Sequence, residues 1–309
     1  MKDAVKRKDL RRRVYEHREL YLFLLPAALY FILFNYIPMG GIVIAFKNFK
    51  IGKGIFGSKW VGLKYFIRIF GMAKFPVVVM NTIRLSAYTL LAGIPLPIIL
   101  ALLLNTCSMP RLKKVVQTVT YAPHFISTVV VVAMVNVFFA PTNGIVSNLL
   151  MKTGAIQTPL MALTDPKAFP HLYVWSGVWQ SIGWNSIIYL GALTGVDPSL
   201  HESAMIDGAN KLQRILHIDL PCIMPTIILL LIMNCGSIMN VGFEKAFLMQ
   251  RPLNLETSEV ISTYVYKLGI QDMQYSMATA VGVFNSVINF ALVITVNTIS
   301  RRLSDSSLW

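Results

Sequence analysis

Charged residues are scarce in this sequence, and acidic ones are the scarcer kind. Only 14% of the 309 residues are charged, with 28 Lys or Arg against 14 Asp or Glu, whereas 55% are hydrophobic and the mean hydropathy is +0.60. One soluble core cannot bury that much apolar surface in a chain of this length. The composition therefore excludes an ordinary soluble protein and predicts a chain embedded in a lipid bilayer.

Patterns typical of a metal site or a disulfide framework are absent too. The cysteines, Cys107, Cys222 and Cys235, are scattered in or beside apolar segments without C-x-x-C spacing, and the five histidines show no i, i+4 pairing near a carboxylate. Isolated cysteines of this kind behave as small apolar residues. We therefore predict no metal site.

A phosphate-binding loop is also missing. The nearest string, GKGIFGSK at residues 52–59, lacks the Gly-Lys-Ser/Thr order that wraps phosphates in backbone amides and places a lysine on them. We therefore expect no cofactor in this chain and no catalytic residues.

Long apolar stretches are abundant. A bilayer core of about 30 Å needs roughly 20 mostly apolar residues per spanning helix, and six stretches meet this length: residues 20–46, 77–104, 115–140, 172–196, 222–243 and 276–300. Several contain prolines, which membrane helices tolerate when neighbouring helices satisfy the freed backbone groups. The sequence predicts an all-α integral membrane protein with six transmembrane helices.

The first 19 residues carry eight basic side chains and directly precede the first apolar stretch. That stretch is too long for a signal peptide and has no small-residue cleavage site, so we predict a cytoplasmic basic tail at 1–19 and a six-span membrane domain at 20–309. A nucleic-acid-binding arm is the weaker interpretation of the tail. The predicted inner segments hold 15 Lys or Arg and the outer loops 12, so the orientation, with both termini cytoplasmic, depends mainly on this tail and on the polar segment at 197–221 described below.

One predicted outer loop, residues 47–76, which we call the basic outer loop, contains seven basic residues and no acidic one. In one interpretation its lysines reach lipid phosphates from an interfacial helix at Leu63 to Phe75, whose apolar face includes Phe66, Ile67 and Phe70. In the other, the loop is an electropositive mouth that attracts an anionic solute or an acidic delivery protein. The sequence leaves both open.

A polar segment between the fourth and fifth apolar stretches reads DPSLHESAMIDGANKLQRILHIDLPCIMP, from Asp197 to Pro225. Ser199 and Glu202 have capping-box spacing, Asp197 and Pro198 also suit a helix start, and Gly208 suits a helix end in the left-handed conformation. A second amphipathic stretch, Lys211 to Ile218, follows. The segment predicts a stiff helix–turn–helix outside the bilayer.

This segment resembles the EAA loop of binding-protein-dependent ABC importer permeases. The family spacing is met by Glu202, Ser203, Ala204, Gly208, Ile218, Leu220 and Pro221, with Ser203 where the family usually has Ala. The resemblance implies a type I ABC importer permease fold and a coupling loop at about 197–221 that presses into an ATPase dimer. It implies that Glu202 and Asp207 make polar contacts with the ATPase and that Gly208 makes the turn after the helix. It also implies that Ala204, Met205 and Ala209, with the small Ser203 beside them, pack against the ATPase.

The wider chain resembles the oligosaccharide and polysaccharide branch related to the maltose importer, through YLFLLP at 21–26, FGSKWVGLKYF at 56–66 and YAPHFIS at 121–127. The resemblance implies a second permease subunit, a separate ATPase dimer that carries ATP and Mg²⁺, an extracytoplasmic solute-binding protein, an oligosaccharide substrate and a bacterial cytoplasmic membrane. The basic outer loop favours an acidic oligosaccharide.

Solute contacts are expected from polar and aromatic side chains at mid-membrane depth that face the bundle interior. Two stretches qualify and also match the sugar-contacting regions of the maltose-type subunit. These are Trp179, Gln180, Ser181, Trp184 and Asn185 in the fourth span, and Asn234, Ser237, Asn240 and Glu244 in the fifth, where a 3, 3, 4 spacing predicts one helical face. Helix–helix hydrogen bonding uses the same residue types and stays open.

Three other functions compete with this interpretation. A permease for a non-sugar solute would share the coupling loop. A membrane-embedded glycosyltransferase would need clustered acids at an aqueous face, and the predicted outer acids show no such grouping: Asp165, Glu244, Glu256, Glu259 and Asp272. A channel would need a filter loop or a charged gating helix, and neither pattern is present.

Overall fold

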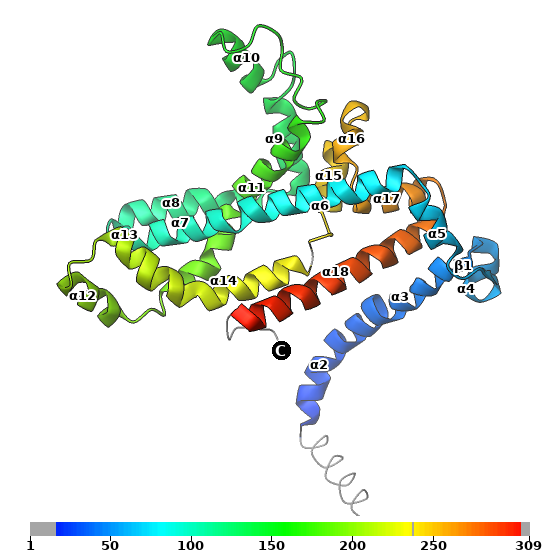
Figure 1. Ribbon diagram of the computed structural model, residues 1–309, viewed down its shortest axis with the longest axis horizontal. Coiled ribbons are helices and arrows are strands. Elements are labelled where there is room, and N and C mark those ends of the chain that lie inside the picture. The colour runs from blue at the N-terminus through cyan, green and yellow to red at the C-terminus, as the bar shows by residue number, and fades with distance from the viewer. Residues whose placement is uncertain (1–16, 237, 304–309) are drawn as a thin grey trace, which may run out of the picture.

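The computed structural model describes residues 17–236 and 238–303, and this part of the chain is an elongated helical bundle (Figure 1). Most of the predicted basic tail, residues 1–16, and the candidate solute contact Ser237 lie outside the described residues.

Three long helical segments run along the bundle. They are α6 (Lys74–Gly93) with α7 (Pro95–Thr106), α14 (Leu220–Cys235) with the preceding α13 (Lys211–Arg214) and π-helical turn η5 (Ile215–Asp219), and α18 (Tyr275–Leu303). Helix α11 (Ala168–Leu193) crosses this group and packs along α7, α6 and α8 (Pro110–Tyr121) (Figure 1). Apolar side chains at helical spacing form the contacts, in one cluster around Phe75, Ile261 and Val281, a second around Phe169 and Val174, and a third around Ala101 and Ile223.

The number of spans differs from the sequence prediction. Among the described residues, four helical segments are long and apolar enough to cross a membrane: Arg18–Phe46, Lys74–Thr106, Lys211–Cys235 and Tyr275–Arg301. A fifth candidate, Pro110–Phe125 with Thr128–Phe138, is bent by 102°. The predicted fourth span is present as the 26-residue α11 but is not among these apolar segments. The predicted count of six is therefore not established.

The bend in the third predicted span has a local cause. Helix α8 passes into the short turn η4 (Ala122–Phe125), Ile126 is extended, and Ser127 begins α9 (Thr128–Phe138) by accepting a hydrogen bond from the backbone N–H of Val130. A serine in the extended conformation is a favourable N-cap, so the chain starts a second helix here instead of continuing the first.

The fifth predicted span, 222–243, is wrong at its end. Helix α14 stops at Cys235, and residues 238–242 are not helical before α15 (Phe243–Met249) begins. Gly236 lies so close to α18 that a Cβ there would sit 2.9 Å from the Val293 side chain. Irregular backbone at membrane depth is tolerated where it is buried in protein or lines a cavity.

The N-terminal segment stands apart from the bundle over α2 (Arg18–Phe31), whose side chains are almost all exposed (Figure 1). It continues through η1 (Ile32–Tyr36) and α3 (Ile37–Met39) to η2 (Gly40–Phe46), which packs on α18. So apolar a surface is stable only against lipid or another membrane helix.

The basic outer loop forms a compact substructure at one end of the bundle. Antiparallel strands β1 (Lys47–Asn48) and β2 (Lys59–Trp60) enclose η3 (Ile51–Lys53) and α4 (Gly54–Gly57), and α5 (Lys64–Phe70) follows. The interfacial helix predicted from Leu63 to Phe75 is therefore shorter than expected, since α5 ends at Phe70 and Gly71 follows it as the C-cap. Of its predicted apolar face, Ile67 is exposed and Phe66 is half-buried against Phe46.

The remaining short elements connect the long ones. They are α10 (Ile145–Lys152), which protrudes beyond α9, α12 (Pro198–Ile206), η6 (Pro252–Asn254), α16 (Leu255–Ser258), α17 (Ile261–Tyr266) and the π-helical turn η7 (Lys267–Gln271) (Figure 1). Helix α12 lies at the opposite end of the bundle from the basic outer loop (Figure 1).

Candidate functional site

The predicted coupling loop forms a helix whose start is set by Asp197. Its carboxylate accepts a hydrogen bond from the backbone N–H of Ser199 at 2.9 Å, and Pro198 occupies the first turn. This hydrogen bond lowers the pKa of Asp197. The alternative capping box between Ser199 and Glu202 does not form, because Ser199 lies inside the helix, where its carbonyl accepts a hydrogen bond from the Ser203 hydroxyl.

Gly208 ends α12 as the sequence predicted. Its φ is +80°, its N–H donates to the Met205 carbonyl, and the N–H of Ala209 donates to the Ala204 carbonyl. This pair of bonds is the Schellman arrangement, which requires the left-handed conformation that glycine adopts at least cost. The next helix starts with a capping box between Asn210 and Gln213 that the sequence analysis missed. The helix–turn–helix prediction is confirmed.

The side chains of α12 face away from the bundle. Glu202, Met205 and Asp207 are exposed, as are Ser203 and Gly208, whereas Ala204 and Ala209 are half-buried. The sequence analysis missed Ile206, whose side chain is 87% exposed at the tip of the helix. An apolar side chain so exposed beside acidic ones suits a surface that docks onto another protein.

The base of this helix contacts the bundle through a histidine and a buried aspartate that no sequence pattern had singled out. His201 Nε2 lies 3.3 Å from a carboxylate oxygen of Asp219, which is buried at the start of α14. Arg214 lines the same small cavity of about 280 Å³. The contact connects the exposed helix α12 directly to the start of α14.

A cavity of about 380 Å³ lies between α6, α11, α14 and α15, and we call it the polar cavity. It contains four of the predicted solute contacts, Gln180, Ser181, Asn185 and Asn234, together with Lys245, Thr89 and the edge of Tyr173. Gln180 and Ser181 are at the middle of the 26-residue α11, which is about 39 Å long at 1.5 Å per residue. The volume is within the range of small-molecule pockets.

Three of the four predicted contacts in the polar cavity, Gln180, Ser181 and Asn234, each donate one hydrogen bond to a backbone carbonyl. The Gln180 amide donates to the Ile126 carbonyl at 2.7 Å, which satisfies the backbone at the bend between η4 and α9. Ser181 donates to the Gly177 carbonyl, and Asn234 donates to the Leu230 carbonyl. The Gln180 amide and the Ser181 hydroxyl have further donors or acceptors with which a ligand can bond.

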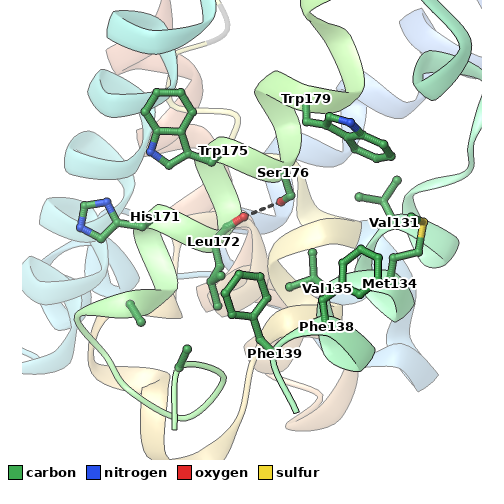
Figure 2. Close-up of a pocket in the computed structure, with 12 residues that line it drawn as sticks. Val131, Met134, Val135, Phe138, Phe139, His171, Leu172, Trp175, Ser176 and Trp179 are labelled. Atoms are coloured by element: carbon green, nitrogen blue, oxygen red, sulfur yellow. Dashed lines mark hydrogen bonds between the residues drawn. The ribbon is translucent and has the colours of Figure 1, made fainter. Parts of the chain in front are cut away.

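The predicted tryptophans lie elsewhere. Trp179 lines an apolar cavity of about 560 Å³ between α9 and α11, with Val131, Met134 and Trp175 (Figure 2). Ser176 lines the same cavity but turns its hydroxyl to the Leu172 carbonyl (Figure 2). Trp184 stacks on His124 at 4.3 Å between ring centroids. The structure therefore separates both tryptophans from the polar cavity.

The contacts predicted after Asn234 do not share one helical face, because α14 ends at Cys235. Asn240 instead accepts hydrogen bonds from Asn285 and Asn289 of α18, at 2.9 and 3.2 Å. Glu244 is exposed in the first turn of α15. The 3, 3, 4 spacing argument was wrong for this reason, although the break that replaces the helix brings Lys245 to the polar cavity.

Comparison with known proteins assigns this architecture to a family. Residues 93–305 match the binding-protein-dependent transport system inner membrane component family, and the chain belongs to that family. It is therefore the membrane-spanning permease component of a transport system, not an enzyme. The predicted family and the all-α permease fold are confirmed.

Particular relatives extend along nearly the whole chain. It is 40% identical over 304 residues to the polygalacturonan/rhamnogalacturonan transport system permease protein YteP of Bacillus subtilis (strain 168), covering 98% of this chain and 94% of YteP. It is also 40% identical to a chain in the crystal structure of a bacterial ABC transporter involved in the import of the acidic polysaccharide alginate, with a TM-score of 0.89 over 96% of this chain and 99% of that one. A chain in the complex of the alginate transporter with alginate pentasaccharide-bound periplasmic protein matches equally well, with 39% identity over the same shares of the two chains and a TM-score of 0.89.

Proposed function

We propose that this chain forms half of the translocation pore of an ATP-driven importer for an acidic oligosaccharide. The observation that carries the proposal is the similarity along nearly the full length to two permeases whose names specify acidic polysaccharides, polygalacturonan and alginate. The basic outer loop supports it. Lys74 is paired with Glu259 at 2.6 Å, but the other six basic residues of the loop have no carboxylate within 4 Å among the described residues.

The partners follow from the family and from the exposed surfaces. A second permease subunit would complete the pore, a solute-binding protein would deliver the oligosaccharide, and a separate ATPase dimer would supply ATP and Mg²⁺. In this proposal α12 inserts into the ATPase, with Glu202, Ser203, Ala204, Met205, Asp207, Gly208 and Ala209 at the contact. Closure of the ATPases then rocks the bundle between two access states.

The orientation belongs to the same proposal. If α12 meets the ATPase, its end of the bundle is cytoplasmic, and the basic outer loop at the opposite end faces outward. Helix α18 runs toward the α12 end (Figure 1), so the C-terminus would be cytoplasmic, as the basic N-terminal tail would be.

The test is uptake by the full complex in proteoliposomes, with alginate pentasaccharide and maltopentaose as probes. We expect ATP-dependent uptake of the acidic probe, and no ATP hydrolysis by this chain alone. Uptake of maltopentaose without uptake of the acidic probe would contradict the acidic substrate but preserve the permease role. ATP hydrolysis by the purified chain alone would contradict both.

A further inference from the structure

We propose that Lys245 is the cationic contact for a sugar carboxylate at the wall of the polar cavity, and so determines the preference for acidic cargo. The inference rests on the proposed function, because it names the residue by which the translocation site would recognise an acidic sugar. No sequence pattern had singled out Lys245, which follows the fifth apolar stretch at 222–243.

Lys245 is a buried cation without an acidic partner. Its side chain is 9% exposed, and no Asp or Glu among the described residues comes within 4 Å of its ammonium. Lysines are almost never buried to this degree unless they are paired, because an isolated buried charge is costly. In the described part of the chain, the other buried charges, Asp219 and Glu259, both have an oppositely charged or ionisable neighbour.

The ammonium group is held at the cavity by α11. Nζ donates to the Tyr173 carbonyl at 2.8 Å and lies 4.9 Å from the centroid of the Tyr173 ring. A lysine ammonium has three donors, so this single bond leaves two for a ligand. Lys245 lines the same cavity as Gln180, Ser181 and Asn234, whose amides and hydroxyl suit sugar hydroxyl groups.

Glycine makes the room that the ammonium occupies. A Cβ at Gly177 would lie 3.0 Å from Nζ, so a side chain there would crowd the lysine against its carbonyl partner. Gly177 is one turn along α11 from Tyr173, and without a side chain it leaves that carbonyl open to a donor from α15. The site is therefore built from both elements.

A carboxylate fits this position better than any other group of an oligosaccharide. Sugar hydroxyls can be satisfied by the neutral side chains of the cavity, but only an anion neutralises the ammonium, and such charge-assisted hydrogen bonds are about twice as strong as neutral ones. The alternative is that Lys245 is only a structural tie between α15 and α11. A structural tie would affect acidic and neutral cargo alike.

The test compares two probes on the complete importer in proteoliposomes, with the solute-binding protein saturated. The probes are alginate pentasaccharide and the same pentasaccharide with its carboxyl groups reduced to alcohols. We expect Lys245→Met to lower ATP-dependent uptake of the acidic probe at least tenfold and uptake of the reduced probe less than twofold, with Lys245→Arg in between. Lys152→Met, at an exposed lysine of α10, is the matched control and should change neither.

A second variant keeps the lysine in place. Gly177→Ala should also lower uptake of the acidic probe selectively, because it crowds the ammonium, and co-purification with the partner subunits reports whether each variant assembles. Equal loss of both probes in assembled Lys245→Met, or no loss of either, would overturn the carboxylate contact while leaving the proposed function intact. Failure of the wild type to take up either probe would overturn the proposed function and this inference with it.

Discussion

At the scale of single residues, two glycines carry requirements that no other residue type meets as well. Gly208 needs its positive φ to close α12, and Gly183 needs its missing side chain, because a Cβ there would lie 2.2 Å from the Thr120 carbonyl oxygen. The requirement at Gly208 concerns backbone conformation, and the requirement at Gly183 concerns the distance between α11 and α8. Substitutions separate the two effects.

Gly208→Val should uncouple transport without preventing membrane insertion. A β-branched residue in the left-handed region costs about 1–2 kcal/mol, which favours a different turn and misplaces α12. We expect loss of ATPase recruitment, measured by co-purification, and loss of uptake. Asn tolerates the left-handed conformation, so Gly208→Asn should retain most activity. Full transport by Gly208→Val would contradict the role of the turn.

Gly183→Ala should destabilise the fold by about 1–3 kcal/mol, because the added methyl group forces α11 away from α8. Thermal unfolding in detergent measures the effect. The matched control is Gly191→Ala on the same helix, where a Cβ meets nothing within 4 Å and where alanine is the better helix former. Equal melting temperatures for the two variants would refute the close approach.

At the scale of elements, the end of the bundle that carries the basic outer loop is held by one buried carboxylate. Glu259, between α16 and α17, is 3% exposed and receives Lys74 of α6 at 2.6 Å and Lys267 of η7 at 2.8 Å. Burial alone would raise the pKa of Glu259, but the hydrogen bonds and charges of the two lysines outweigh it and lower the pKa. The three elements are therefore joined most strongly when Glu259 is ionised.

This linkage predicts a pH dependence of stability. Because the folded-state pKa is lowered, the stabilisation is fully present above the ordinary glutamate pKa of about 4.3 and is lost as the pH falls through the folded value. Glu259→Gln should lower stability by about 1–3 kcal/mol at pH 7 and flatten the decline in melting temperature between about pH 5 and 3. Glu256→Gln, at an exposed neighbouring glutamate, should leave both unchanged, and a decline as steep in Glu259→Gln as in the wild type would refute the linkage.

At the scale of the whole molecule, charge is distributed unevenly between the two ends. The basic outer loop is fixed to α18, because Ser276 accepts from the Phe49 N–H and donates to the Lys47 carbonyl. Lys50, Lys53 and Lys59 project from it as exposed cations, whereas Lys47 donates to the Ile55 carbonyl and has a structural role. A rigid cluster of one sign raises the local concentration of anions.

Replacing Lys50, Lys53 and Lys59 by Gln should therefore slow uptake of alginate pentasaccharide, most strongly at low ionic strength, because the effect is screened beyond about 8–10 Å at physiological salt. Initial uptake rates at several salt concentrations measure it. The control is the double variant Lys152→Gln and Lys167→Gln, which changes two exposed lysines of another predicted outer loop. Unchanged uptake, or a loss independent of salt, would mean that the loop lysines serve only to anchor the loop to lipid.

The sequence by itself determined the class of this protein. Apolar length, the basic tail and the EAA spacing depend only on the order of residues, so the helical membrane fold, the family and the turn at Gly208 were predictable. The sequence left two possible starts for α12, one at Asp197 and one at a Ser199–Glu202 capping box. In the structure the helix starts after Asp197, because the Asp197 carboxylate accepts a hydrogen bond from the Ser199 N–H.

Only the tertiary structure decided which predicted residues share a site. Helical periodicity assumes an unbroken helix, and α14 breaks after Cys235, where Gly236 packs closely on α18 and Asn240 bonds to it. Trp179 and Gln180 are likewise neighbours in the sequence of α11. Because adjacent residues of a helix point to different faces, these two side chains line different cavities. Lys245 reaches the polar cavity because that break turns α15 toward α11, an effect of packing between distant segments that no local pattern encodes.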